Sequence, residues 1–537
     1  MPILAKLVNI ILPLGVYWFV FSLIKKPGKS FWALFLFVFF GAFQIVLLYL
    51  FGEAIIAVDM FLNLINTNPN EAFELLNNLW PGMVFVIIVY VPSLILAIQS
   101  IRKKETLSTS FLKKQRKWAL SCTLAGIALL IATYTTLQPQ YKYEAKVDLF
   151  PVNVCYNAVL AVERKMQVDN YYTTSEDFQF HATTQRNPEE KEVYIFVIGE
   201  TGRALNWSLY GYDKPTNPLL EQIDNLLVFP DAITESNTTH KSVPLLLSAA
   251  SAQNYSAVYK QKSIVTAFKE AGFETLYCSN HRGNNSYIDF YAAEADETIY
   301  LKSGLPPTAN VYDLELEKKV KERLAKGYNK LFIVLHSYGS HFNYLERYPN
   351  SDAFFHPDNE TRATPKNKKS LHNAYDNTIR YTDMFLARLI DTLSKENVSS
   401  ALLYTSDHGE DIFDDKRNLF LHASPVPSYY QLHVPFLIWM SNEYKEQNNS
   451  IFEMIKQNQK QPISTNLNTF HTLLSIGGIN TPFLESDYSL ATELYNVTTR
   501  YYLNDHCKPK TLDQIGLKKL DFEMFDKMSI HYNKSSN

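Results

Sequence analysis

The sequence contains little cysteine and no excess of charge of either sign. Its 537 residues include 4 cysteines: Cys122 lies in a long apolar run, and Cys155, Cys278 and Cys507 are far apart. These few cysteines do not form a disulfide framework. The folded parts must therefore be stabilised mainly by their hydrophobic cores. The 51 basic and 54 acidic residues give a net charge of -3. This balance argues against nucleic acid as a partner.

Apolar residues are concentrated in the first quarter of the chain, and residues 1–137 form a predicted transmembrane domain. Four runs are each about as long as a helix that crosses a bilayer: Leu4–Ile24, Phe31–Ala57, Met83–Ile101 and Trp118–Thr135. The first run is too long for a signal peptide, and no small-residue cleavage site follows it. We therefore expect it to remain in the membrane.

Lysine and arginine predict how these four spans are oriented. Lys25, Lys26 and Lys29 lie between the first two runs, and segment 102–117 between the last two is also rich in basic residues. Because basic loops stay in the cytoplasm, both loops are predicted to be cytoplasmic. The amino terminus, loop 58–81 and everything after the fourth span are then outside.

The outer loop 58–81 carries a regular polar pattern. Asn63, Thr67 and Glu71 recur every four residues, which aligns them on one face of a helix. Pro69 falls within the pattern, so two short helices or a kink are expected. An apolar helix lying in the lipid headgroups would show the same spacing, and spacing alone favours that interpretation.

Two further segments follow the predicted spans. Residues 138–190 are mixed in character and are predicted to bridge along the membrane surface. Residues 191–537 alternate strand and helix patterns, which predicts an α/β domain with a largely parallel sheet and helices on both faces. The apolar runs are Val193–Ile198, Thr275–Cys278, Leu331–Leu335, Ala401–Thr405 and Pro435–Met440, and the helical patterns between them are Ser263–Ala271, Leu314–Ala325 and Asn373–Leu393.

Two of these strands end in side chains that suit a metal ion. Val193–Ile198 runs into Gly199 and Glu200, and Ala401–Thr405 runs into Asp407 and His408. The carboxyl ends of parallel strands are where such sheets bind ligands. Carboxylate oxygens and an imidazole nitrogen suit zinc. The alternatives are a helix cap for Glu200 and a simple turn for Asp407 and His408.

Three further histidines are candidates. Leu331–Leu335 leads into His336 and, beyond a glycine, His341, while His422 follows Asp407 downstream. We favour His341 as a ligand and interpret His336 as packed at the strand end. Taken singly, each is more typical of an ordinary histidine.

A hydroxyl nucleophile is available just before an apolar helical run. Thr238, Thr239 and Ser242 precede Pro244 there. The field at a helix amino terminus, together with a metal ion, can activate a hydroxyl for attack. A helix cap is the plain alternative, and spacing does not separate the three hydroxyls.

Seven ordered segments resemble the bacterial phosphoethanolamine transferases. This group of the alkaline phosphatase and sulfatase superfamily includes the lipid A modifying and mobile colistin-resistance enzymes. The segments cover most of the chain and read VIGETGRALNWSLYGYDKPTNP, NTTHKSVPLLLS, FIVLHSYGSHFNYLERYP, AYDNTIRYTDMFL, TSDHGE, VPFLIW and FHTLLSIGGINTP.

The resemblance implies an assignment of roles. The zinc ligands fall on Glu200, Thr239, Asp407 and His408, with Thr239 as the nucleophile that takes phosphoethanolamine from phosphatidylethanolamine. His341 and His422 match residues that contact the substrate phosphate or a second zinc. Asn63, Thr67 and Glu71 match residues that meet the ethanolamine end of the donor, which replaces the headgroup-helix interpretation. The implied protein is monomeric, lies in the bacterial inner membrane with its catalytic domain in the periplasm, and has an envelope glycolipid as acceptor: lipid A or lipopolysaccharide core.

The chain departs from this family in three respects. The lipid A enzymes usually have five spans, against four here. Glu235 and Leu245 occupy two places of the family's disulfide cysteines, and the cysteine-rich segment with its substrate-binding lysine is replaced near Ser279–Gly283, where Arg282 could substitute. Phe342-Asn343 follows His341 in place of Gly-Pro. Alternatives are a phosphodiesterase or phosphoglycerol transferase of the same superfamily, and a catalytically silent lipid-binding membrane protein.

Overall fold

The structure, a computed structural model, describes most of the chain as two compact units. Unit 1 comprises Met1–Ile65 with Leu75–Lys165, and unit 2 comprises Asn66–Glu74 with Met166–Asn537. The division after Lys165 falls within the predicted bridge 138–190, and the predicted domain boundaries remain predictions. The residues described are 2–51, 56–66, 69–136, 143–306, 308–360, 362–497 and 499–533, without the side chains of 48–51, 63–66 and 69–81.

Unit 1 is helical in the part of the chain that the structure describes. Three stretches there are long and apolar enough to cross a membrane: Ile3–Phe21, Gly82–Arg102 and Thr109–Thr136. The predicted span Phe31–Ala57 is broken, because Pro27–Ala33 and Phe35–Leu47 meet at 66°. Counted as one span, this bent pair would make the fourth. The main helices are α1 (Ile3–Phe21), α2 (Pro27–Ala33), α3 (Phe35–Phe51), α4 (Val58–Asn66), α5 (Pro69–Arg102), α6 (Thr109–Thr136), α7 (Ala145–Asp148) and α8 (Val152–Asp169), which enters unit 2.

Two glycines allow α1 and α6 to pack closely. A Cβ atom on Gly15 would lie 2.5 Å from the backbone nitrogen of Thr123, and one on Gly126 would lie 2.6 Å from the Cα of Leu12. Membrane helices commonly approach through such small residues, because the hydrophobic effect does not drive their association in lipid and close van der Waals packing takes its place. A larger residue at either position would force the pair apart.

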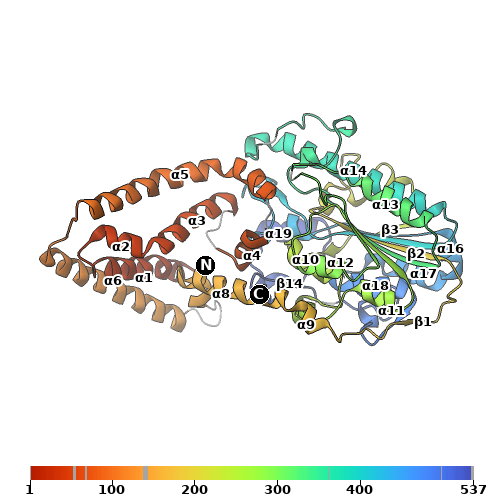
Figure 1. The fold of residues 1–537 in the computed structure, drawn as a ribbon, viewed down its shortest axis with the longest axis horizontal. Coiled ribbons are helices and arrows are strands. Elements are labelled where there is room, and N and C mark those ends of the chain that lie inside the picture. Colours follow the sequence, from red (N-terminus) through yellow and green to blue (C-terminus); the bar gives the residue numbers. More distant parts are fainter. Residues whose placement is uncertain are drawn as a thin grey trace. The chain divides into compact units, whose positions relative to one another are not determined.

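Unit 2 is built on a seven-stranded sheet of order β3-β11-β8-β2-β7-β5-β6 (Figure 1). Only β11 runs opposite to the other strands, so the predicted largely parallel sheet is confirmed. The five predicted strands are present, whereas β3 and β6 were not predicted. The strands are β3 (Leu226–Val228), β11 (Phe436–Met440), β8 (Ser399–Ser406), β2 (Glu192–Gly199), β7 (Lys330–His336), β5 (Glu274–Ser279) and β6 (Glu297–Tyr300).

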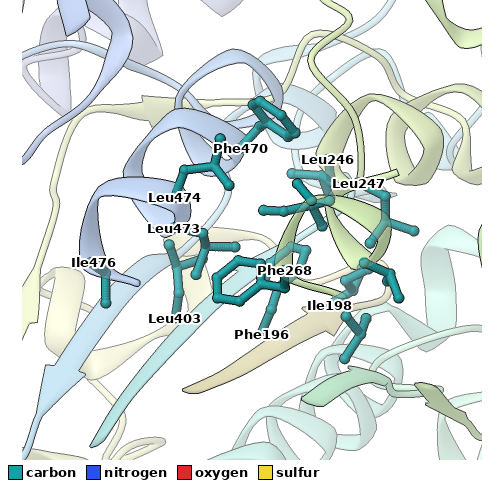
Figure 2. Close-up of a cluster of buried hydrophobic side chains, with 14 of the residues drawn as sticks. Phe196, Ile198, Leu246, Leu247, Phe268, Leu403, Phe470, Leu473, Leu474 and Ile476 are labelled. Carbon is teal, nitrogen blue, oxygen red and sulfur yellow. The ribbon is translucent and has the colours of Figure 1, made fainter. Parts of the chain in front are cut away.

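Helices cover both faces of this sheet, as predicted (Figure 1). Side chains of β2 alternate between two cores: Phe196 and Ile198 pack with α10, α11 and α18, while Ile195 and Val197 pack with α13 and α14. Figure 2 shows the first core, where Phe268 of α11 lies beside Phe196 and α18 closes the far side. The bounds are α10 (Thr239–Leu246), α11 (Ile264–Glu270), α12 (Tyr287–Ala292), α13 (Leu314–Ala325), α14 (Lys368–Ser394) and α18 (Thr465–Ile476).

Glu235 is a buried carboxyl in unit 2. It is 2% exposed and accepts hydrogen bonds from the backbone nitrogen of Ala252 (2.9 Å) and the hydroxyl of Ser464 (3.1 Å). Burial raises its pKa to about 7, although both hydrogen bonds oppose the rise. A folded pKa above the unfolded one means that folding binds a proton, so stability is lost as pH rises from about 4.5 towards 7.

We expect Glu235→Gln to remove this loss. The variant should be up to about 3 kcal/mol more stable than the wild type at pH 8 but within about 1 kcal/mol of it at pH 5, because a pKa difference of about 2.5 corresponds to the larger value. Pulse proteolysis of the full chain in urea at both pH values measures the difference. Glu322→Gln, a surface change in the Lys319 pair, is the matched control. A Glu235→Gln effect of equal size at both pH values would contradict the expectation.

Candidate metal centre and active site

The predicted ligands converge where β2 and β8 end at the same edge of the sheet. Gly199, the last residue of β2, pairs with Ser406, the last residue of β8. Glu200 directly follows Gly199, and Asp407 directly follows Ser406. The backbone nitrogen of Asp407 donates to the Gly199 carbonyl at 2.9 Å. Glu200, Asp407 and His408 are all at most 1% exposed. The parallel register thus brings residues about 200 positions apart in the chain into one buried cluster.

The amino terminus of α10 brings one hydroxyl into this cluster. Thr239 Oγ1 lies 3.2 Å from Glu200 Oε1 and 3.2 Å from His408 Nε2. The Thr238 hydroxyl instead pairs with Ser236 at 3.2 Å, and Ser242 donates to the Asp407 carbonyl at 2.6 Å. The three hydroxyls that the sequence left unresolved are therefore separated by geometry, and Thr239 is the one that faces the ligands.

Two hydrogen-bond acceptors of the cluster, a histidine nitrogen and a carboxylate oxygen, face each other. His408 Nδ1 lies 3.0 Å from the Gly409 carbonyl and therefore carries the imidazole proton, which leaves Nε2 unprotonated. This nitrogen faces Asp407 Oδ2 at 3.2 Å. Asp407 Oδ1 accepts from the Thr201 and His408 backbone nitrogens, but Oδ2 has no hydrogen-bond partner among the described residues. A cation between these atoms would satisfy all of them, and the donor set fits zinc.

The acid–base properties of the cluster suit a divalent cation. Burial, followed by the nearby Asp407 carboxylate, raises the pKa of Glu200 well above its ordinary value. Burial also raises the pKa of Asp407 to about 6, whereas burial and the neighbouring His422 lower the pKa of His408. Two carboxylates buried side by side cannot both ionise without a counter-charge. A bound divalent cation would supply it.

Of the two predicted accessory histidines, His422 lies closer to the centre. Its ring centroid is 4.1 Å from that of His408, and its Nδ1 is 3.5 Å from Glu410 Oε2. His341 lies farther out, with its ring centroid 6.4 Å from that of His422. Potential ligand atoms of Glu200, His408 and His422 lie within 4.8 Å of one another. His422 thus borders the cluster directly and His341 borders His422.

The sequence interpretation missed His281 at this centre. Its Nε2 lies 4.0 Å from Glu200 Oε2, and its ring stacks on that of His336 at 4.0 Å between centroids. His336 is buried, as interpreted, and burial lowers its pKa to about 3. His281 follows β5 by two residues, so its place at the same sheet edge could have been inferred once β5 was known to pair with β7.

Two other predicted residue sets have different outcomes. Arg282 donates to the backbone carbonyls of Lys302 (2.8 Å), Leu305 (3.2 Å) and Pro306 (2.6 Å), which holds this loop in place. Its substitution for a substrate-binding lysine remains a hypothesis. For the outer loop, Asn63 falls in α4 and Glu71 in α5, but Thr67 and the side chains of all three lie outside the described residues.

One glycine lets the loop after β7 pass against Glu200. Gly339 has a φ of 48°, and a Cβ atom there would lie 2.6 Å from the Glu200 carbonyl oxygen. The neighbouring Ser340 nitrogen donates to the same carbonyl at 2.9 Å. Only glycine adopts this conformation without strain and leaves room for the ligand-bearing turn.

Two family models match the chain. The Sulfatase model matches residues 192–479, more than half of the chain, and the model of phosphoethanolamine transferase EptA/EptB matches residues 10–166. The chain therefore belongs to the sulfatase family, in the group of phosphoethanolamine transferases with an EptA/EptB-type amino-terminal domain. The resemblance inferred from the seven segments is confirmed.

Individual relatives agree with this assignment. Phosphoethanolamine transferase EptA of Escherichia coli (strain K12) is 30% identical over 310 residues, 56% of each chain. The full-length lipooligosaccharide phosphoethanolamine transferase A from Neisseria meningitidis has a similar fold, with a TM-score of 0.70, 21% identity, and coverage of 91% of this chain and 97% of that one. The periplasmic domain of Escherichia coli EptC, solved in complex with Zn, matches with a TM-score of 0.56 and 24% identity over 62% of this chain and 96% of that one. The chain spans little more than half the length of the curated relatives it matches.

Proposed function

We propose that this protein transfers phosphoethanolamine from phosphatidylethanolamine to an envelope glycolipid, lipid A or lipopolysaccharide core, through a phosphothreonine on Thr239. The observation that carries the proposal is the placement of Thr239 Oγ1 against Glu200 and His408 in a buried cluster that also holds the Asp407 carboxylate. Membership of the phosphoethanolamine transferase group supports phosphoethanolamine as the transferred group, and the donor is proposed from the resemblance of the sequence segments. Similarity to a Kdo(2)-lipid A phosphoethanolamine transferase supports the class of acceptor.

Glu200, Thr239, Asp407 and His408 would hold a zinc ion. When bound, zinc lowers the pKa of the threonine hydroxyl and neutralises charge on phosphoryl oxygens. Thr239 Oγ1 then attacks the donor phosphorus, and the bond to the diacylglycerol oxygen breaks. The Thr239 proton would pass to His341 or His422, which would then give it to the leaving diacylglycerol oxygen.

The second half of the reaction restores the enzyme. An acceptor oxygen attacks the phosphothreonine and the threonine–phosphorus bond breaks. The acceptor's proton, taken by His341 or His422, would return to Thr239 Oγ1. Asn63, Thr67 and Glu71 are assigned to the ethanolamine end of the donor on the resemblance alone. A carboxylate suits that role, because an ammonium group favours a negative partner.

The proposed setting is the bacterial inner membrane. Three described apolar helices, or four with the bent pair, would anchor a monomer. The basic loops would face the cytoplasm and the catalytic domain the periplasm. Both lipid substrates would then be reached from the outer side of this membrane.

The decisive test is intact-protein mass spectrometry of the detergent-solubilised full chain. After incubation with zinc and phosphatidylethanolamine without acceptor, we expect a mass gain of one phosphoethanolamine group that maps to Thr239 and is absent in Thr239→Ala. Ser242→Ala, which changes a hydroxyl that donates to the Asp407 backbone carbonyl and does not contact the Glu200 or His408 side chain, should keep the adduct. Steady release of free phosphoethanolamine without an adduct would favour a phosphodiesterase instead. If neither an adduct nor free phosphoethanolamine is detected, the remaining explanations are a catalytically silent lipid-binding protein or a different donor.

A further inference from the structure

His336, the last residue of β7, is a buried imidazole whose polar atoms are unsatisfied. The residue is 1% exposed, and neither ring nitrogen has a hydrogen-bond partner within the part of the chain that the structure describes. Leaving a buried polar group unpaired is destabilising, because the group loses its hydrogen bonds to water. Buried groups of this kind are normally satisfied by protein, water or an ion. A ligand bound to either ring nitrogen of His336 would therefore stabilise the fold.

The neighbours of His336 are themselves ligand types. His281 stacks on it, and Glu200 lies beside His281, with Oε2 4.0 Å from Nε2. One ligand atom from each of these three residues falls within a common distance of 4.8 Å. A zinc ion with bonds of about 2.0–2.2 Å holds its ligands up to roughly 4 Å apart, so small side-chain rotations suffice to close the set.

We propose that Glu200, His281 and His336 form a second divalent-cation site of the zinc type. The site differs from the His341 and His422 pair in its ligands: His422 lies beside His408, and the Tyr338 ring packs against both His341 and His281. It rests on the proposed function in one respect, because Glu200 would be shared with the zinc that binds Thr239. Its own two histidines come from the ends of β5 and β7, which pair in the sheet.

The chemistry of each ligand suits this role. The Glu200 carboxylate has two oxygens: Oε1 lies 3.2 Å from Thr239 Oγ1 and 3.6 Å from His408 Nε2, while Oε2 lies 3.4 Å from Thr239 Oγ1 and 4.0 Å from His281 Nε2. A bridging carboxylate can therefore serve both ions. His281 Nε2 lies 2.8 Å from the Ser337 carbonyl and carries its proton towards it. Ligation through this nitrogen moves the proton to Nδ1, and the imidazole stays neutral as metal binding requires.

The site is partly accessible and holds one negative charge. The His281 side chain is 18% exposed, whereas that of Glu200 is 1% exposed, so an ion would enter past His281. The Lys302 ammonium, 3.5 Å from the centroid of the Tyr338 ring, disfavours a cation at His281. The Glu200 carboxylate supplies the negative charge that opposes this repulsion. Two ions that share one carboxylate would clamp both sides of a phosphoryl group, as two-metal phosphoryl-transfer sites do.

Metal counting tests the proposal. The full chain in detergent is stripped with a chelator, reloaded with Zn²⁺ and desalted, and zinc per protein is measured by inductively coupled plasma mass spectrometry. We expect His336→Gln and His281→Gln each to bind one zinc fewer than the wild type. His356→Gln, a change at an exposed histidine paired with Asp358, should bind the full amount. His281→Gln keeps the test valid if the buried His336→Gln variant does not fold.

Anomalous scattering at the zinc edge from crystals of the reloaded protein gives the location directly. A peak between Glu200, His281 and His336 supports the proposal. Equal zinc content in wild type and both variants, or a map with no peak there, overturns it. The two hypotheses fail differently: one zinc with a normal Thr239 adduct refutes only this second site, whereas a wild type that binds no zinc and forms no adduct refutes the proposed function as well.

Discussion

Asp407→Asn is expected to lose the zinc ion that Thr239 helps to hold and to lower phosphoethanolamine transfer by at least about 1000-fold. The change preserves shape, and the amide oxygen can still accept from the Thr201 and His408 backbone nitrogens as Oδ1 does. What is lost is Oδ2, which faces His408 Nε2 at 3.2 Å and has no other partner among the described residues. The expected factor corresponds to about 4 kcal/mol of transition-state stabilisation, in the range that a metal ion supplies.

Two measurements on the full chain check this prediction: bound zinc per protein, and transfer from a phosphatidylethanolamine with a labelled headgroup. Asp391→Asn is the matched control, because Asp391 pairs with Lys395 on the surface and both side chains are more than half exposed. It should retain wild-type zinc and turnover. If Asp407→Asn kept both properties, the buried cluster would not be the catalytic metal centre.

The sequence predicted the metal ligands at the strand ends better than it predicted the other residues of the site. Val193–Ile198 and Ala401–Thr405 are unbroken apolar runs, as expected of strands buried on both faces, and each is followed at once by its ligand. Parallel pairing then forces Glu200 and Asp407 together. Local pattern was sufficient for these residues because strand, turn and ligand are contiguous in the chain.

Other site residues depend on contacts that no local pattern records. Thr238, Thr239 and Ser242 share one short segment, and only the angle at which α10 meets the sheet decides which hydroxyl faces Glu200. His281 required the order of β7 and β5 in the sheet. The short strand β3 was missed because three residues show no alternation, and its pairing with β11 is what defines it.

Arg203 connects the two turns that carry the predicted zinc ligands. It lies three residues after Glu200 and is 1% exposed. Its Nη1 is 2.7 Å from Asp414 Oδ2 and 3.1 Å from the carbonyl of Glu410, which follows His408 by two residues. Burial tends to raise the pKa of Asp414, but Arg203 and then His372 bring the pKa below its ordinary value. The ion pair is thus a buried brace between the ends of β2 and β8.

Arg203→Met should destabilise unit 2 by about 3–5 kcal/mol. Methionine fills much of the same space, but the change leaves the Asp414 carboxylate buried without its guanidinium, and removing one partner of a buried pair costs about that much. Pulse proteolysis of the full chain in urea measures the fall in the unfolding midpoint. Arg388→Met, at a half-exposed arginine 3.8 Å from Glu317, should shift it by less than about 0.5 kcal/mol. Adding Asp414→Asn to Arg203→Met should recover part of the loss, because the uncompensated charge is then gone. The Arg203–Asp414 ion pair would contribute little if the destabilisation of the double variant equalled the sum of the two single-variant losses. The same conclusion would follow if Arg203→Met alone lost less than about 1 kcal/mol.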